Sequence, residues 1–154
     1  MWQVFCQDPA QTHALGVALG SSAPGETVVA LTGDLGAGKT CFAQGVGEGL
    51  GVVEAIVSPT FVLVAEYEGH QPLLHADAYR LRPGEVEGIG LEETLEGWPG
   101  LALVEWAELV GEALPLEHLA VTIEIIDDAR RFHITSTGPR SAAALAKWRA
   151  AHGG

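Results

Sequence analysis

The sequence predicts an α/β domain of three layers, built on a mixed, mainly parallel β-sheet with a C-terminal antiparallel hairpin. Two apolar stretches, residues 27–32 and 101–104, have the length and composition of buried strands. A glycine-rich loop leads from the first stretch into a helical segment, residues 40–50, in which large apolar residues recur every four positions. Residues 119–126 and 131–137 alternate in polarity around the turn 127–130, as the strands of a hairpin do.

The other predicted elements rest on local signals. Asp8 and Pro9 precede an apolar segment as a helix cap and a first helical residue do. A Glu-Gly-His-Gln-Pro turn separates two β-prone runs, and glycines interrupt an acidic helical segment. We therefore expect, in chain order, a helix over 11–19, strands over 61–67 and 73–81, short helices within 85–95 and a final helix over 141–151.

Length and composition favour one globular domain over residues 1–154. Hydrophobic residues make up 47% of the 154 residues, and charged residues 18%. No apolar run reaches the roughly 18 residues of a membrane span, and the first ten residues do not resemble a secretory signal. Cys6 and Cys41 form no close-spaced pair, so we expect free thiols and a cytoplasmic protein.

The net charge of −12 argues against strong direct binding of DNA or RNA, because an acidic surface repels a phosphate backbone. The acids are concentrated in residues 58–115, which carry eleven acidic residues against two arginines. This acidic region is either a docking surface for a basic partner or an ordinary solvated surface, and the sequence leaves both readings open.

The glycine-rich loop, Gly33-Asp34-Leu35-Gly36-Ala37-Gly38-Lys39-Thr40, matches the phosphate-binding pattern G-x-x-x-x-G-K-[ST] at every fixed position. Its glycines let the backbone turn tightly and direct several N–H groups at one anion, and the following helix adds its dipole. Lys39 is placed to reach the β- and γ-phosphates, and the Thr40 hydroxyl is a candidate ligand of Mg²⁺. The pattern predicts a P-loop NTPase-like fold that binds a nucleoside triphosphate.

The chain contains no asparagine, so the Asn-Lys-x-Asp element that reads guanine is absent and ATP is favoured. A P-loop enzyme also needs acids at neighbouring strand ends, to hold the metal and to orient the attacking water. Asp77 and Glu105 each follow a predicted strand. Either acid fits either role, and a helix cap or surface charge is the alternative for each.

Four further positions are weaker candidates. Thr60, in Ser58-Pro59-Thr60, lies where many P-loop proteins sense the γ-phosphate, although the same tripeptide also forms ordinary turns. Trp106 is placed to stack on a base or to pack in the core. His75 alternates with Asp77 and fits a side chain that points into the sheet, and Arg80 is surrounded by acids with which it can pair.

Four blocks in this order and spacing resemble the TsaE family, the bacterial ATPases of tRNA threonylcarbamoyladenosine synthesis. The blocks are Gly33–Thr40, Ser58-Pro59-Thr60-Phe61, His75-Ala76-Asp77-Ala78-Tyr79-Arg80-Leu81 and Val104-Glu105-Trp106. A P-loop alone is shared by many families, whereas four blocks within about 80 residues are far more specific. The sequence departs from the family at Ala78, where a large apolar residue is usual, and at Ala107, where proline is frequent.

The resemblance implies an ATP- and Mg²⁺-dependent accessory protein that works with TsaB and TsaD, which modify adenosine 37 of tRNA. Contact with tRNA would then be indirect. By position, the resemblance makes Lys39 and Thr40 the phosphate and metal residues and Thr60 the switch threonine. It makes Asp77 and Glu105 the metal-binding and water-orienting acids, and places Trp106 near the nucleotide.

Two other functions compete with a partner-dependent ATPase. A small-molecule or nucleotide kinase needs an acceptor pocket and several lid arginines, yet Arg80 and Arg82 are the only arginines before residue 130. A nucleotide-gated binding module would bind ATP and change its affinity for a partner without useful turnover.

Overall fold

The computed structural model describes residues 1–34, 37–56, 64–78 and 90–153. The described strands form one seven-stranded sheet in the order β1-β7-β6-β2-β5-β4-β3. The strands are β1 (Trp2–Cys6), β2 (Thr27–Gly33), β3 (Val64–Tyr67), β4 (Leu73–Asp77), β5 (Leu101–Glu105), β6 (Leu119–Ile126) and β7 (Ala129–Ser136). The helices are α1 (Pro9–Ser22), α2 (Lys39–Gly49), α4 (Leu91–Glu96) and α5 (Pro139–His152), with short 3₁₀ helices η1 (Ala107–Leu109) and η2 (Gly111–Ala113).

The sheet is mixed, as predicted, but it is not mainly parallel. Within the described strands, β6–β2, β2–β5 and β5–β4 are parallel, whereas β1–β7, β7–β6 and β4–β3 are antiparallel. Short connections force β3–β4 and β6–β7 to be antiparallel, because a parallel pair needs a long crossover. The central strands β6, β2, β5 and β4 therefore run parallel, and both edges are antiparallel.

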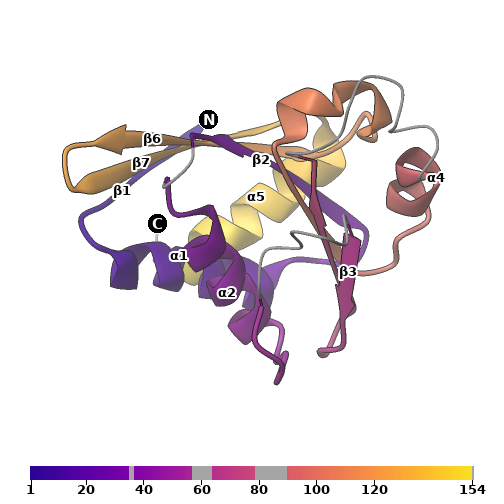
Figure 1. Cartoon of the computed structure of the whole chain (residues 1–154), viewed down its shortest axis with the longest axis horizontal. Coiled ribbons are helices and arrows are strands. Elements are labelled where there is room, and N and C mark those ends of the chain that lie inside the picture. The colour runs from indigo at the N-terminus through magenta and orange to yellow at the C-terminus, as the bar shows by residue number, and fades with distance from the viewer. Residues whose placement is uncertain (35–36, 57–63, 79–89, 154) are drawn as a thin grey trace.

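Helices α1, α2 and α5 lie together against one face of the sheet (Figure 1). Helix α4 and the 3₁₀ helices contribute to a second apolar cluster on the other face. The central strands supply both clusters because successive side chains point to opposite faces. In β2, for example, Val29 and Leu31 belong to the α1–α2–α5 cluster, and Val28 and Ala30 belong to the other.

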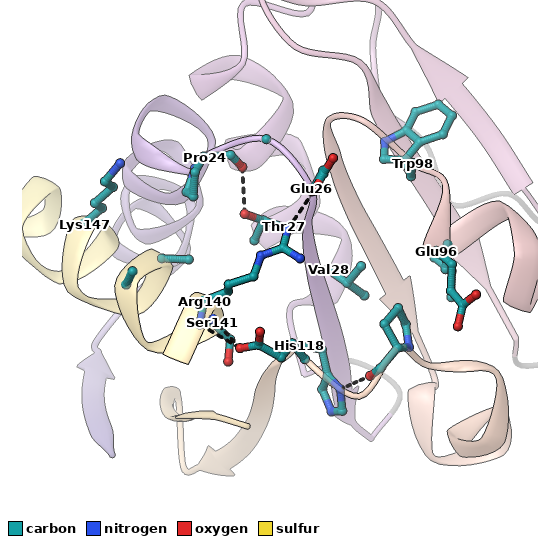
Figure 2. A pocket seen from close by; sticks show the side chains of 16 residues that line it. Pro24, Glu26, Thr27, Val28, Glu96, Trp98, His118, Arg140, Ser141 and Lys147 are labelled. Carbon is teal, nitrogen blue, oxygen red and sulfur yellow. Dashed lines mark hydrogen bonds and ion pairs between the residues drawn. The ribbon is translucent and has the colours of Figure 1, made fainter. Parts of the chain in front are cut away.

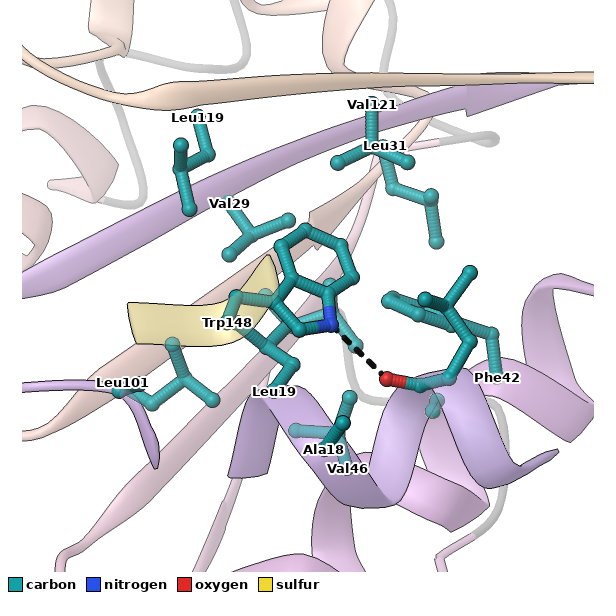
Figure 3. Close-up of a cluster of buried hydrophobic side chains, with 14 of the residues drawn as sticks. Ala18, Leu19, Val29, Leu31, Phe42, Val46, Leu101, Leu119, Val121 and Trp148 are labelled. Atoms are coloured by element: carbon teal, nitrogen blue, oxygen red, sulfur yellow. Dashed lines mark hydrogen bonds between the residues drawn. The ribbon is translucent and has the colours of Figure 1, made fainter. Parts of the chain in front are cut away.

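Trp148 of α5 occupies the centre of the larger cluster, among side chains from α1, α2 and the sheet (Figure 3). Its indole Nε1–H donates to the backbone oxygen of Leu15 at 3.0 Å, so the one polar atom of this fully buried ring is satisfied. The ring also packs edge-on against Trp2 at 5.4 Å between centroids and lies 5.9 Å from Phe42. These contacts tie the two ends of the chain to the helix that follows the P-loop.

Helices α1 and α2 approach each other through four glycines, Gly16, Gly20, Gly45 and Gly49. A Cβ atom at any of them would lie 2.2–2.4 Å from a backbone oxygen of the facing helix. No side chain fits at such a distance, so glycine is what allows the two backbones to pack directly. This contact fixes the position of α2, which carries the P-loop lysine and threonine at its first turn.

Most predicted elements are present, with local corrections. Asp8 caps α1, because its Oδ1 accepts from the Gln11 amide at 2.9 Å, and Pro9 is the first helical residue, as predicted. The hairpin turn is shorter than predicted, because Ala129 already pairs with Ile126. Helix α5 begins at Pro139, since proline suits the first helical turn. Residues 57–63 and 79–89, which include parts of three predicted elements, lie outside the described residues.

Strand β1 was not predicted from the sequence. Its buried residues Trp2 and Cys6 point toward the helices, but the exposed Phe5 breaks the apolar–polar alternation that would have marked an edge strand. Both cysteines are free, as expected. No helix within the described ranges is long and apolar enough to cross a membrane.

Candidate functional site

The P-loop connects the carboxyl end of β2 to the amino end of α2. The central parallel strands point their carboxyl ends toward this edge, where α/β proteins bind nucleotides. Gly38 immediately precedes α2 with φ +99°, a left-handed conformation that glycine adopts without strain. Leu35 and Gly36 of the motif lie outside the described residues, whereas Gly33, Asp34 and Ala37 to Thr40 are described.

Lys39 is folded back onto the loop that carries it. Its Nζ donates to the backbone oxygen of Gly33 and, at 3.3 Å, to that of Asp34. The same ammonium lies 3.7 Å from the centroid of the Trp106 ring, close enough for a cation–π contact. The side chain is buried, so its charge is held by carbonyl dipoles and an aromatic face instead of water.

Asp77 and Glu105 are the last residues of β4 and β5 and are direct neighbours in the parallel register. Glu105 in turn aligns with Leu31 of β2, two residues before the P-loop begins. The alternation of side chains places both acids on the sheet face that α2 covers. Glu105 is only 2% exposed, whereas Asp77 is half-buried, so Asp77 is the more accessible to solvent of the two carboxylates.

Burial and the nearby carboxylates act on Lys39 in opposite directions. Burial lowers the pKa of the Lys39 ammonium from its ordinary 10.5, because removing the charge from water disfavours it. Nearby carboxylates oppose this shift, in the order Glu105, Glu108, Asp77 and Asp34. One buried cation and several acids therefore act at one site. A phosphate that enters this site would accept a hydrogen bond from the Lys39 ammonium, which water solvates poorly.

Glu105 has a buried partner that the sequence did not reveal. His75, two residues before Asp77 in β4, is fully buried, and its Nε2 is hydrogen-bonded to Glu105 Oε2. The other ring nitrogen, Nδ1, is buried and has no hydrogen-bond partner in the described part of the chain. The sequence pattern predicted an inward-pointing His75, and the side chain is indeed buried, but the pattern did not predict its hydrogen bond to Glu105.

Arg130 is the other contributor that sequence reasoning missed. It lies near the start of β7, and its Nε–H donates to the backbone oxygen of Ala37 at 3.1 Å, across 93 positions of sequence. The guanidinium therefore braces the P-loop from β7, two strands away from β2 in the sheet. Its position next to a hairpin turn gave no signal of this contact.

The remaining candidates are placed as follows. Thr40 and Asp34 are exposed at the site, and Trp106 is partly buried there, with a left-handed backbone at φ +56°. Trp106 thus contacts the P-loop lysine and also packs on the second apolar cluster. Thr60 and Arg80 lie outside the described residues.

The described residues contain no group of three or more histidine, cysteine or acidic side chains that could hold a metal ion by themselves. That composition still fits Mg²⁺ at a phosphate site, because this ion is usually held by one or two carboxylates together with phosphate oxygens and water. The Thr40 hydroxyl and the carboxylate of Asp77 or Glu105 are donors of the required oxygen type.

A separate cavity of about 510 Å³ lies at the opposite edge of the sheet, between the amino ends of β2 and β6 and the start of α5 (Figure 2). Arg140 in its wall pairs with Glu26 at 2.7 Å. Glu117 accepts from the backbone amides of Arg140 and Ser141 and so caps α5. These charged groups are engaged with the protein itself, and the cavity shares no residue with the P-loop.

The chain is similar to known proteins over most of its length. A family model described as "Threonylcarbamoyl adenosine biosynthesis protein TsaE" matches residues 6–132. The TsaE protein of Nostoc sp. is 48% identical over 112 residues, covering 70% of this chain and 69% of that protein. The TsaE protein of Bacillus subtilis is 43% identical over 135 residues, covering 86% and 84%. A crystal structure of YdiB from Bacillus subtilis is similar with a TM-score of 0.84 and 35% identity, covering 97% of this chain and 94% of that one. The chain therefore belongs to the TsaE family of tRNA threonylcarbamoyladenosine biosynthesis proteins.

Proposed function

We propose that the chain binds ATP with Mg²⁺ and hydrolyses it as an accessory step of tRNA threonylcarbamoyladenosine synthesis, together with the TsaB–TsaD complex. One observation carries the proposal: the P-loop lysine and two strand-end acids, Asp77 and Glu105, converge at the carboxyl edge of the parallel strands. This combination supplies both a phosphate cradle and the acids that hydrolysis needs. Family membership supplies the biological context.

In this proposal, the P-loop backbone and Lys39 bind the β- and γ-phosphates. Lys39 must leave the carbonyl oxygens of Gly33 and Asp34, and a phosphate oxygen replaces them as its partner. The exchange is favourable because a charged oxygen is a stronger acceptor than a carbonyl for a buried ammonium. Bound Mg²⁺ would neutralise phosphate charge, with the Thr40 hydroxyl and Asp77 as its protein donors.

We propose that Glu105 orients the attacking water. Its carboxylate is buried and already bonded through Oε2, so Oε1 is the oxygen left to accept a proton or to orient a water. Asp77 is nearer to solvent, as suits an acid that binds an ion through water. Thr60, in a segment outside the described residues, keeps the proposed role of γ-phosphate sensor.

The deciding experiment measures threonylcarbamoyladenosine formation in tRNA. The reaction contains TsaB, TsaD, the enzyme that makes threonylcarbamoyl-adenylate, ATP, threonine and bicarbonate, with wild-type chain, Lys39→Ala or Lys147→Ala. Lys147 is the matched control, because it is the only other lysine and lines the distant cavity. We expect multiple turnover with wild type and Lys147→Ala, but not with Lys39→Ala.

Equal product with and without the wild-type chain, in the presence of competent partners, would remove the accessory role. Radiolabelled ATP then separates the alternatives. Label transferred to an acceptor other than water would indicate a kinase. Tight ATP binding with no hydrolysis in a single turnover, even with TsaB and TsaD present, would indicate a nucleotide-gated binding module.

A further inference from the structure

His75 and Glu105 form a polar pair inside the sheet layer that faces α2. Because His75 precedes Asp77 by two residues and Asp77 aligns with Glu105, all three side chains lie on the same face. His75 is 0% exposed and Glu105 is 2% exposed. Burying an imidazole and a carboxylate costs free energy, and apolar residues of similar volume often serve stability as well or better. Stability alone is therefore a weak reason for this pair.

The hydrogen bond also defines the tautomer of His75. Nε2 is the nitrogen that faces Glu105 Oε2, and an ionised carboxylate can only accept, so Nε2 is the nitrogen that carries the proton and donates it. Nδ1 is buried without a partner in the described residues, which suits a bare lone pair better than a second N–H group. The imidazole can therefore act as a single fixed donor aimed at one oxygen of the acid.

We propose that His75 is a positioning residue for hydrolysis, because it fixes one carboxylate oxygen of Glu105 and thereby holds the other toward the attacking water. Glu105 has three side-chain torsions, and its reach into the site depends on all of them. Anchoring Oε2 removes that freedom before nucleotide binds. The oxygen of a general base must lie within about 2.6–3.2 Å of the atom whose proton it takes, so a poorly held carboxylate slows hydrolysis even when the nucleotide binds normally.

This inference rests on the proposed function, and its test uses amide substitutions of different length. In His75→Gln, the amide nitrogen can occupy the place of Nε2 and donate to Glu105. In His75→Asn, the amide ends near the place of Nδ1 and falls short of the acid. His75→Leu removes the donor and keeps an apolar side chain of similar bulk.

Single-turnover hydrolysis of radiolabelled ATP, with TsaB and TsaD present, gives the rate for each variant, and titration calorimetry gives the affinity for MgATP. We expect His75→Leu and His75→Asn to lose about 10- to 100-fold in rate, the range typical when a partner that orients an active-site ligand is removed. We expect His75→Gln to recover much of that loss. ATP affinity should stay within about twofold of wild type in all three, because the hydrogen bond of His75 goes to Glu105 and not to the described part of the P-loop.

Two results would overturn the inference. One is a wild-type rate in a folded His75→Leu chain. The other is an equal loss in the Gln, Asn and Leu variants, because a structural defect would not distinguish the two amides by length.

If the wild-type chain hydrolyses no ATP under any condition, the proposed function fails, and the hydrogen bond is then judged by NMR. A His75 Nε2–H signal that resists exchange with water and disappears in Glu105→Ala would support an ordered pair. A rapidly exchanging Nε2–H, or one that Glu105→Ala leaves unchanged, would refute it.

Discussion

The contact between α1 and α2 allows a quantitative prediction for Gly45→Ala. The added Cβ would lie 2.2 Å from the backbone oxygen of His13, with the His13 carbonyl carbon at 3.1 Å and Gly16 Cα at 3.2 Å. Close C–H···O contacts in proteins are about 3.3–3.6 Å, so the helices must separate by about 1 Å at this point. The obstructing atoms belong to the backbone and have no rotamer to change.

Strain of this kind typically costs about 1–3 kcal/mol, and an immovable obstacle places Gly45→Ala near the upper end. Replacing a helical glycine with alanine returns up to about 1 kcal/mol of helix propensity. The net loss is then about 2 kcal/mol. For a chain of this size, 1 kcal/mol corresponds to roughly 2–4 °C in Tm, so the expected decrease is about 4–8 °C.

Differential scanning calorimetry measures the decrease in Tm, with Gly111→Ala as the matched control. A Cβ atom added at Gly111 would meet no described atom within 4 Å beyond its chain neighbours, so the same substitution there should leave Tm unchanged. The turnover of Gly45→Ala should fall as well, because α2 carries the P-loop lysine. Wild-type Tm and turnover in Gly45→Ala would show that the helices accommodate a methyl group, and the close-packing argument would be wrong.

Three other predictions concern the site. Glu105→Ala should retain ATP affinity within a few-fold by calorimetry and lose most hydrolysis, whereas the control variant Glu112→Ala, at an exposed acid of η2, should lose little. Loss of binding in Glu105→Ala would contradict the assigned water-orienting role. Arg130→Ala should weaken ATP binding by about 3- to 10-fold, because one charged donor to the P-loop is lost. The control variant Arg131→Ala, which removes an exposed ion pair with Glu124 at 3.4 Å, should leave ATP binding unchanged. Equal effects of the two substitutions would refute the bracing role of Arg130. Burial raises the pKa of the Cys41 thiol above its ordinary 9.0, so less thiolate forms at a given pH. Alkylation of Cys41 by iodoacetamide should therefore be slower than that of a free thiol at pH 8, and its rate should continue to rise above pH 9. A rate that reaches a plateau below pH 8 would contradict the shift.

The elements that the sequence predicted well are those specified by local chemistry. Asp8 and Pro9 mark the start of α1 because a cap and a fixed φ act within one turn. Strand β2 is apolar over residues 28–31 and β5 over residues 101–104, because both faces of these stretches are buried, and the P-loop motif fixes the connection between β2 and α2. The pattern does not predict β1, because the exposed Phe5 interrupts the alternation of this edge strand, which pairs with β7 more than 120 positions later in the chain.

The site divides in the same way. The phosphate loop and the two strand-end acids could be recognised from the sequence, because P-loop chemistry requires particular residues at fixed spacings and strand ends. Folding was needed to pair His75 with Glu105, to place Trp106 on Lys39 and to bring Arg130 to Ala37. These contacts join residues up to 93 positions apart, through sheet register and side-chain direction, and no local pattern encodes either. The sequence therefore specified the reactive groups, and packing decided which partners hold them in place.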